Sequence, residues 1–202
     1  MKVIGVGCGP GMLTQEAIGE IGKARRIYGS RRAVEMAKEF IPQGCEVRGI
    51  EDYAKVRELP DDAVILSTGD PMLAGLGYPG AKIMPGISSM QVAFARLCLP
   101  LARAAAVTAH GSGHERAVAE AIDELKRGKI VFIIADPGFD VQGLAECMGQ
   151  RGLNCKIAIC EDLGYGSERI EIGTTESPPE ARSRLFSIVA WRRERSCSSR
   201  GS

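Results

Sequence analysis

The stretch VIGVGCGPGMLT, residues 3–14, decides the fold of this chain. Its first residues, 3–6, are mostly apolar and β-branched, which predicts the first strand of a sheet. The strand runs into a turn that holds four glycines and one proline: Gly5, Gly7, Gly9, Pro10 and Gly11. A helix with one apolar face follows, with Thr14 near its start. A strand, a glycine turn and a helix in this order predict a small-ligand site at the carboxyl edge of a sheet.

The glycine turn does not match the dinucleotide-binding pattern G-x-G-x-x-G. Counted from Gly5, the third glycine would be residue 10, which is Pro10, and counted from Gly7 it would be Met12. Pro10 also lacks the N–H that a phosphate would need. We therefore expect a nucleoside-like ligand without a pyrophosphate. The alternative is a tight turn between strand and helix that binds nothing.

The composition is that of a globular protein without a strong overall charge. Of the 202 residues, 45% are hydrophobic and 25% are charged, and the net charge is +1. This charge gives no general attraction to nucleic acid or to an anionic membrane, and no apolar run reaches the ~20 residues of a membrane helix. The seven cysteines include no C-x-x-C pair, which favours reduced thiols. We expect a cytoplasmic protein that binds neither nucleic acid nor membrane.

Strands and helices alternate along the chain, which predicts an α/β fold with a parallel first sheet. The expected strands are residues 3–6, 26–28, 46–50, 63–68 and 81–84, then 105–108, 130–134, 156–160, 168–173 and 185–191. The expected helices follow residue 14 and then cover 31–40, 53–59, 88–97, 115–126 and 141–150. We place a domain boundary at Leu99-Pro100-Leu101, so that residues 1–101 and 102–191 form two α/β domains. Residues 192–202 show no periodic pattern and are expected to be a tail that is disordered or partly vector-derived.

Two connections in this scheme are unusual. Only residues 69–80 separate the strands at 63–68 and 81–84, although a parallel crossover normally needs a dozen or more residues and a helix. Either this crossover is a minimal loop or one of the two strands is misplaced. Near the end of the chain, the strands at 168–173 and 185–191 follow each other without a helix. They predict an antiparallel pair in a mixed second sheet.

Asp70 is expected near the glycine turn. The tripeptide Gly69-Asp70-Pro71 directly follows a strand, and parallel strands end at the same edge of a sheet. The Asp70 carboxylate could accept hydrogen bonds from a ribose or an amino group. The alternative is an Asx turn or a helix cap before Pro71. Further on, Ser88 or Ser89 is the expected N-cap of the helix that runs to residue 97, a position that also permits ligand contact.

Several motifs, taken together, resemble the tetrapyrrole methylases, which transfer methyl groups from S-adenosylmethionine. The motifs are G-V-G-C-G-P-G-x-L-T at 5–14, G-D-P at 69–71, P-G-I-S-S at 85–89, E-D-L-G at 161–164 and E-R-I-E-I-G-T at 168–174. The resemblance covers the chain up to Trp191. Residues 109–111, A-H-G, and 88–97, S-S-M-Q-V-A-F-A-R-L, look most like the branch that contains the cobalt-precorrin-7 carbon-5 methyltransferases of cobalamin biosynthesis.

The resemblance implies a fold, a reaction and a set of cofactor contacts. The fold has two α/β domains, a mainly parallel N-terminal sheet and a mixed C-terminal sheet, with a cleft between them, and it usually forms a homodimer. The reaction is methylation of a ring carbon of a cobalt-precorrin by S-adenosylmethionine. The implied cofactor-binding residues are Gly9, Pro10, Gly11, Asp70, Leu73, Ser88, Ser89, Ala135 and Glu161.

This chain departs from the family pattern in two respects. Members commonly have a longer helical segment between G-D-P and P-G-I-S-S, so the wall formed by residues 74–82 differs here. Some members also carry a second, decarboxylating methyltransferase domain, for which this chain has no room. A separate decarboxylating methyltransferase is therefore an expected partner.

Methyl transfer from a sulfonium depends mainly on near-attack geometry. A carbon nucleophile must still lose a proton, and His110, at a strand end, could assist; the alternative is a histidine that only bonds loop backbone. Although His110 and His114 are four residues apart, Gly111 and Gly113 predict a loop there, so we expect no metal site. A tetrapyrrole precursor carries many carboxylates, and arginine binds carboxylates bidentately. The expected substrate-binding arginines are Arg31, Arg32 and Arg96, each of which is alternatively a solvated surface charge.

Two other functions remain open at this point. A sister methylase of the same fold would act at another macrocycle position or on a protein or RNA substrate. A non-catalytic nucleotide-binding module would bind adenine nucleotides without a preference for the sulfonium methyl donor.

Overall fold

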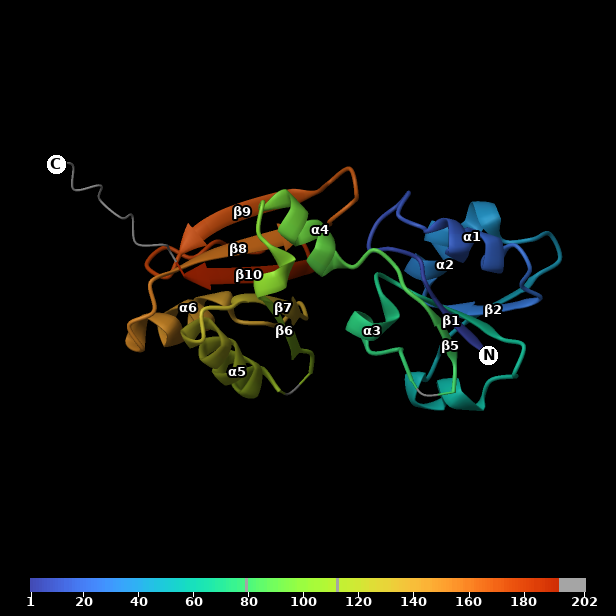
Figure 1. Cartoon of the computed structure of the whole chain (residues 1–202), viewed down its shortest axis with the longest axis horizontal. Coiled ribbons are helices and arrows are strands. Elements are labelled where there is room, and N and C mark those ends of the chain that lie inside the picture. Colours follow the sequence, from blue (N-terminus) through green and yellow to red (C-terminus); the bar gives the residue numbers. More distant parts are fainter. Residues whose placement is uncertain (79, 112, 193–202) are drawn as a thin grey trace. The chain divides into compact units, whose positions relative to one another are not determined.

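The computed structural model describes residues 1–78, 80–111 and 113–192. Contacts divide it into two compact units: residues 1–95 with 163–166, and residues 96–162 with the chain from 167 onward (Figure 1). Both units are α/β, which confirms the predicted fold class. The boundary after residue 101 remains a proposal, and the cleft between the domains stays a prediction. Beyond Arg192, the predicted tail lies outside the described residues.

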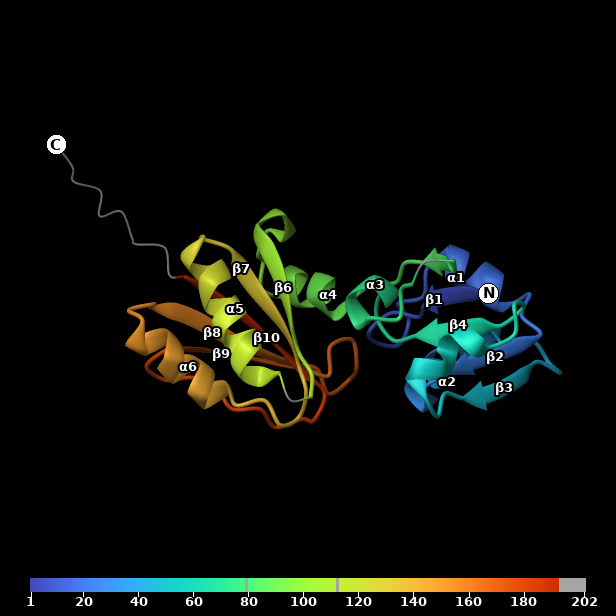
Figure 2. The ribbon, with the colours of Figure 1, turned by 90° about the horizontal axis from the view of Figure 1, so that it is seen from below.

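The first unit contains the predicted parallel sheet of five strands, in the order β3-β2-β4-β1-β5. Its strands are β1 (Lys2–Gly5), β2 (Arg26–Gly29), β3 (Glu46–Gly49), β4 (Val64–Ser67) and β5 (Lys82–Met84). Figure 2 shows β1, β4, β2 and β3 side by side. The short connection from β4 to β5 is a minimal crossover through the one-turn helix α3 (Pro71–Ala74), so neither strand was misplaced.

Helices cover one face of this sheet, as the apolar patterning requires. The helices are α1 (Gln15–Ile21) and α2 (Arg31–Ala37), the latter continued by the 3₁₀ turn η1 (Lys38–Phe40). Because side chains alternate along a strand, Ile4 and Leu66 pack against these helices, whereas Val3 and Ile65 face the opposite side. That side is covered by η2 (Tyr53–Glu58) and by the residues that lead into β5. The central strands are therefore buried on both faces and end together at one carboxyl edge.

The second unit contains a mixed sheet in the order β6-β7-β10-β8-β9. Its strands are β6 (Ala104–Ala109), β7 (Ile130–Ala135), β8 (Cys155–Glu161), β9 (Arg169–Thr174) and β10 (Phe186–Arg192). Its core side is packed by α5 (His114–Lys126) and α6 (Val141–Gln150), and η3 (Leu101–Arg103) precedes β6 (Figure 1). The β6–β7 pair is parallel, and β10 runs antiparallel to both β7 and β8.

The expected pairing of the last two strands with each other is wrong. β9 pairs antiparallel with β8, while β10 inserts between β7 and β8. The reason lies in their side chains: residues 186–190 of β10 are all buried, which suits a central strand. In β9, charged residues alternate with apolar ones and none is fully buried, which suits an edge strand.

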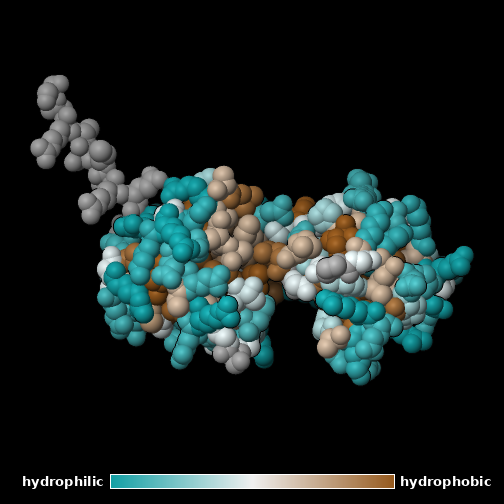
Figure 3. All heavy atoms as spheres, turned by 60° about the horizontal axis from the view of Figure 1, so that its bottom comes forward, coloured by the Kyte–Doolittle hydropathy of each residue, from teal (hydrophilic) through white to brown (hydrophobic). Residues whose placement is uncertain are grey.

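Among the described residues, no helix combines the length and the apolar character that crossing a membrane would require. The face drawn in Figure 3 is mostly hydrophilic but also exposes apolar residues. The buried apolar residues form cores within each unit, among them clusters against both faces of the first sheet and one between the second sheet and the helices α5 and α6.

Candidate functional site

The turns that follow β1 and β4 lie against each other at the carboxyl edge of the first sheet. Gly7 N donates to Gly69 O at 3.3 Å, and Gly69 N donates to Gly7 O at 2.6 Å. Both glycines have positive φ angles, 84° and 70°, which residues with a Cβ rarely adopt. The glycine turn and the G-D-P turn, expected to share this edge, are therefore directly hydrogen-bonded.

The turn after β5 joins them by a backbone approach that only glycine permits. A Cβ on Gly86 would lie 2.2 Å from Gly69 O, and a Cβ on Gly5 would lie 2.5 Å from Gly86 N. Three turns from three neighbouring strands thus meet backbone to backbone. The absence of side chains at Gly5 and Gly86 is what allows the three turns to pack this closely.

Asp70 fixes two of these turns with one carboxylate. Its Oδ1 accepts hydrogen bonds from Met72 N at 2.8 Å and from Leu73 N at 3.3 Å, which caps α3. Its Oδ2 accepts a hydrogen bond from Gly86 N at 3.0 Å. Asp70 is therefore a helix cap, which confirms the alternative interpretation of this residue. The same bonds hold Leu73 and the P-G-I-S-S turn in place beside the glycine turn.

Ser88 is the N-cap of α4 (Ser89–Arg96) and forms a capping box with Gln91. The buried Ser88 Oγ accepts from Gln91 N at 3.1 Å and donates to Gln91 Oε1 at 2.9 Å, and Ser88 N donates to the same oxygen at 2.8 Å. The hydroxyl of Ser88 is therefore engaged within the cap. Ser89 is the first helical residue.

A fourth segment, residues 163–166, packs into the first unit although it lies far along the chain. A Cβ on Gly9 would be 2.7 Å from the Cα of Gly164, and Tyr165 Oη lies 3.6 Å from Met36 Sδ. This contact was not predicted from the sequence. The glycines of the E-D-L-G and G-x-G-P-G motifs were the available signal, but nothing in the sequence shows that they touch.

A hollow of about 710 Å³ lies beside the glycine turn and brings several predicted residues together. Pro10 and Gly11 line it with Arg31 and Arg32 from the first turn of α2. The wall also contains the apolar side chains of Leu13, Ile18, Met36 and Phe40, the charged side chains of Glu35, Lys38 and Glu39, and Tyr165. Arg96 does not line this hollow: its Nε donates to Glu168 Oε1 at 2.7 Å in the second unit.

In the second unit, Asp136 organises the loop that carries His110. Asp136 directly follows Ala135, the last residue of β7. Its Oδ2 lies 3.0 Å from His114 Nε2 and accepts from Gly111 N at 2.9 Å, and its Oδ1 accepts from Gly138 N at 2.8 Å. The hydrogen bond from His114, followed by those from the two amides, lowers the pKa of Asp136 to about 2. This pairing was missed in the sequence, where His114 was weighed only as a metal ligand.

His110 itself is exposed and follows β6. Gly111, with a φ angle of 74°, turns the chain away before α5 begins at His114, as the glycines predicted. Within the described ranges, no three histidine, cysteine, aspartate or glutamate side chains are grouped as metal ligands would be.

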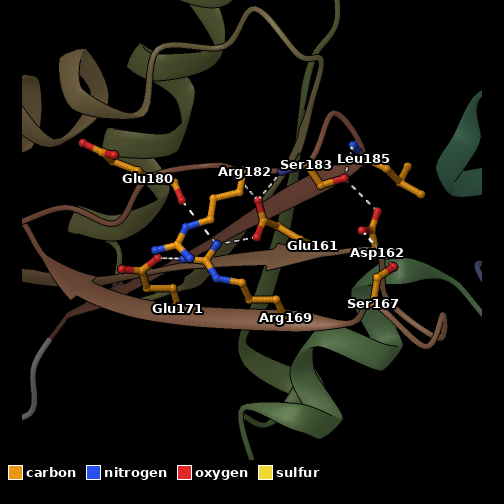
Figure 4. Close-up of polar contacts among 9 residues, drawn as sticks. All are labelled: Glu161, Asp162, Ser167, Arg169, Glu171, Glu180, Arg182, Ser183 and Leu185. Carbon is orange, nitrogen blue, oxygen red and sulfur yellow. Dashed lines mark hydrogen bonds and ion pairs between the residues drawn. The ribbon is translucent and has the colours of Figure 1, made fainter.

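Glu161 is the centre of a buried polar network at the end of β8 (Figure 4). The side chain is 2% exposed, accepts from Ser183 N at 2.7 Å and from Arg182 N, and pairs with Arg169. Burial opposes ionisation of the carboxyl, yet the hydrogen bonds and Arg169 hold its pKa below the usual value. The carboxylate thus fixes the segment that leads into β10.

A family model for Tetrapyrrole (Corrin/Porphyrin) Methylases matches residues 2–179. The chain belongs to this family. No match was found among curated protein sequences. Among solved structures, precorrin-6Y methylase from Archaeoglobus fulgidus is 31% identical over 96% of this chain and 98% of that one, with a TM-score of 0.75.

Two other structures share the fold at lower identity. Cobalt precorrin-4 methyltransferase is 14% identical, with 94% of each chain covered and a TM-score of 0.67. Diphthine synthase is 16% identical, with 95% of this chain and 90% of that one covered and a TM-score of 0.67. The relatives of this tetrapyrrole methylase thus include methyltransferases of cobalamin biosynthesis.

At the sheet edge of this tetrapyrrole methylase, the three turns pack backbone to backbone, and the glycine turn is open at Gly11, where an added Cβ would meet nothing within 4 Å. Pro10 still argues against a pyrophosphate at this turn. The residues predicted to bind the cofactor divide between the units: Gly9, Pro10, Gly11, Asp70, Leu73, Ser88 and Ser89 lie in the first, and Ala135 and Glu161 in the second.

Proposed function

We propose that this tetrapyrrole methylase transfers a methyl group from S-adenosylmethionine to a ring carbon of a cobalt-precorrin, of the carbon-5 type, in cobalamin biosynthesis. The observation that carries the proposal is the junction of three motifs at one sheet edge, through the Gly7–Gly69 pair and the bond from Gly86 N to Asp70. The substrate class is supported by the 31% identity to precorrin-6Y methylase over nearly the whole of both chains.

When bound, S-adenosylmethionine supplies an electrophilic methyl group with a neutral leaving group, so this chain's residues mainly hold and orient the reactants. In our proposal Asp70 keeps the G-D-P and P-G-I-S-S turns in register, and the backbone around Gly9, Pro10 and Gly11 lies against the cofactor. Leu73, Ser88, Ser89, Ala135 and Glu161 complete the proposed set. Since the oxygens of Ser88 and Glu161 are engaged in caps and networks, these two residues would act by shaping the site.

Arg31 and Arg32 are the proposed anchors for the carboxylates of the macrocycle. They border a hollow whose apolar side chains suit the edge of a flat ring. Arg96, oriented by Glu168, is the proposed third anchor. His110 is the proposed acceptor of the proton that leaves the methylated carbon, because its loop is held by Asp136 while its side chain remains exposed. A homodimer and a separate decarboxylating methyltransferase partner remain part of the proposal.

The test is a methylation assay with S-adenosylmethionine and defined cobalt-precorrins. The product's gain of one methyl group is followed by mass spectrometry, and its position by NMR. Methylation at carbon 5 supports the proposal. Methylation at another ring position, or only of a protein or RNA substrate, would replace it by a sister methylase activity. Binding of adenine nucleotides as tight as that of S-adenosylmethionine, with no transfer, would indicate a non-catalytic module.

The Asp70→Ala variant tests the cofactor site without relying on activity. It removes the α3 cap and the acceptor for Gly86 N, so we expect at least about tenfold weaker binding of S-adenosylhomocysteine by titration calorimetry. The Asp70→Asn variant keeps one carbonyl oxygen for the cap but loses the acceptor for Gly86 N, and should bind with intermediate affinity. Unchanged affinity in a folded Asp70→Ala protein would remove Asp70 from the site.

A further inference from the structure

A second hollow, of about 730 Å³, lies in the second unit at the opposite end of its sheet from His110 and Ala135. It is lined where β6, β7 and β8 begin and where β10 ends, with Ile130 and Trp191 among its walls. Strands β6 and β7 each have six residues, so roughly 20 Å of sheet separates the two ends. The proposed methylation chemistry does not use this end of the sheet.

The charges around this hollow are of one sign. Four of its lining residues are cationic, Arg103, Lys129, Lys156 and Arg192, and among the residues that the structure describes no carboxylate lines it. Three other hollows in the described chain each mix both signs, for instance Lys2, Lys23 and Lys82 with Glu20, Asp61 and Asp62 in one of them. In a chain whose net charge is only +1, such segregation creates a local positive field that favours an anion.

The cations are held by the fold at defined places around the cavity. Lys156 of β8 lies directly opposite Trp191 of β10, and its ammonium is 6.0 Å from the centre of the indole ring. Arg103 donates from Nη2 to Gly128 O at 2.9 Å, which fixes the guanidinium at the rim. Lys129 directly precedes β7, and Arg192 is the last residue of β10.

We propose that this hollow binds an oligophosphate anion, at a site separate from the methylation site. Several cations around one cavity match the closely spaced charges of a phosphate chain, lysines acting as point charges and arginines as bidentate donors. The volume is within the range of small-molecule sites. A nucleoside triphosphate and inorganic triphosphate share this chemistry, and the experiment separates them.

The chain contains one tryptophan, Trp191, so its fluorescence reports on this hollow alone. The full-length protein is titrated with ATP, inorganic triphosphate, adenosine and citrate, and binding is confirmed by calorimetry. We expect both phosphate compounds to change the fluorescence and adenosine to leave it unchanged. Tighter binding of ATP than of triphosphate identifies a nucleotide, and equal binding identifies the phosphate chain as the ligand.

The double variant Lys129→Gln/Lys156→Gln should weaken triphosphate binding by at least about tenfold in calorimetry. Its matched control, Lys23→Gln/Lys82→Gln, removes the same charge from a mixed hollow in the first unit and should bind as the unmodified protein does. The proposal is overturned if neither phosphate compound binds at millimolar concentration, if citrate binds as tightly as triphosphate, or if both double variants lose affinity equally.

Discussion

At the scale of single residues, Gly86 is the most tightly constrained position of the candidate site. Its Cα lies so close to the β1 and β4 turns that an added Cβ would meet the carbonyl oxygen of Gly69, a backbone atom that cannot rotate away. Because the neighbouring atoms belong to Gly5 and Gly69, relief would require a shift of the strand ends themselves.

The Gly86→Ala variant should therefore lower the free energy of unfolding by about 3 kcal/mol, since overpacking forces the backbone apart. Its matched control is Gly19→Ala in α1, where an added Cβ meets nothing within 4 Å and alanine favours the helix. This control should gain up to about 1 kcal/mol. Urea denaturation followed by circular dichroism measures both values. Equal stability of the two variants would show that the three turns do not meet as described.

Residue-scale features were partly predictable. The cap of α4 could be predicted from the sequence, because a serine side chain reaches an N–H only three residues further on. The contact of Gly9 with Gly164 could not, because glycine carries no side chain whose chemistry would indicate a partner. The pair of His114 and Asp136 was missed for a related reason: it depends on the parallel neighbours β6 and β7 ending together.

At the scale of elements, the order of the strands in the second sheet follows from which strand has buried side chains on both faces, and the local sequence pattern does not show this. The strands themselves were predicted to within one or two residues, since period and turn residues are local signals. The position of β10 between β7 and β8 depends on which strand can bury both faces, which is a property of the whole sheet. The segment that leads into β10 is held at the end of β8 by the hydrogen bonds from Arg182 N and Ser183 N to Glu161.

The Glu161→Gln variant tests this connection. It removes the charge that Arg169 pairs with, in a side chain that is 2% exposed, so we expect a loss of about 2 kcal/mol in the free energy of unfolding. The matched control is Glu171→Gln. Glu171 is a second partner of Arg169, and its own side chain is 42% exposed. The control should lose less than about 0.5 kcal/mol. Equal losses in urea denaturation would contradict a special role for Glu161.

At the scale of the whole molecule, each unit holds its own apolar core, and the cysteines report on these cores. Cys155 and Cys160 lie in β8 and are buried, whereas Cys98 is exposed. Burial raises the pKa of Cys155 to about 11 and that of Cys160 to about 12. Neither thiol forms much thiolate near neutral pH.

We expect iodoacetamide at pH 8 to label Cys98 in the native protein and to leave Cys155 and Cys160 unmodified. In urea the two buried thiols should become reactive together, because one strand carries both. Peptide mapping by mass spectrometry measures each site. Native labelling of Cys160 at the rate of Cys98 would contradict the packing of the second sheet.

Residues 163–166 make the first unit depend on a segment that follows most of the second unit in the chain. These four residues, about 150 positions beyond the glycine turn, supply the neighbour of Gly9 and the tyrosine that lines the hollow beside Arg31. A fragment ending near residue 95 would keep all five parallel strands and still lack Tyr165 from the wall of the hollow beside the glycine turn. During synthesis on the ribosome, residues 1–95 can therefore assemble their core early, but this hollow is completed only after residues 163–166 have emerged.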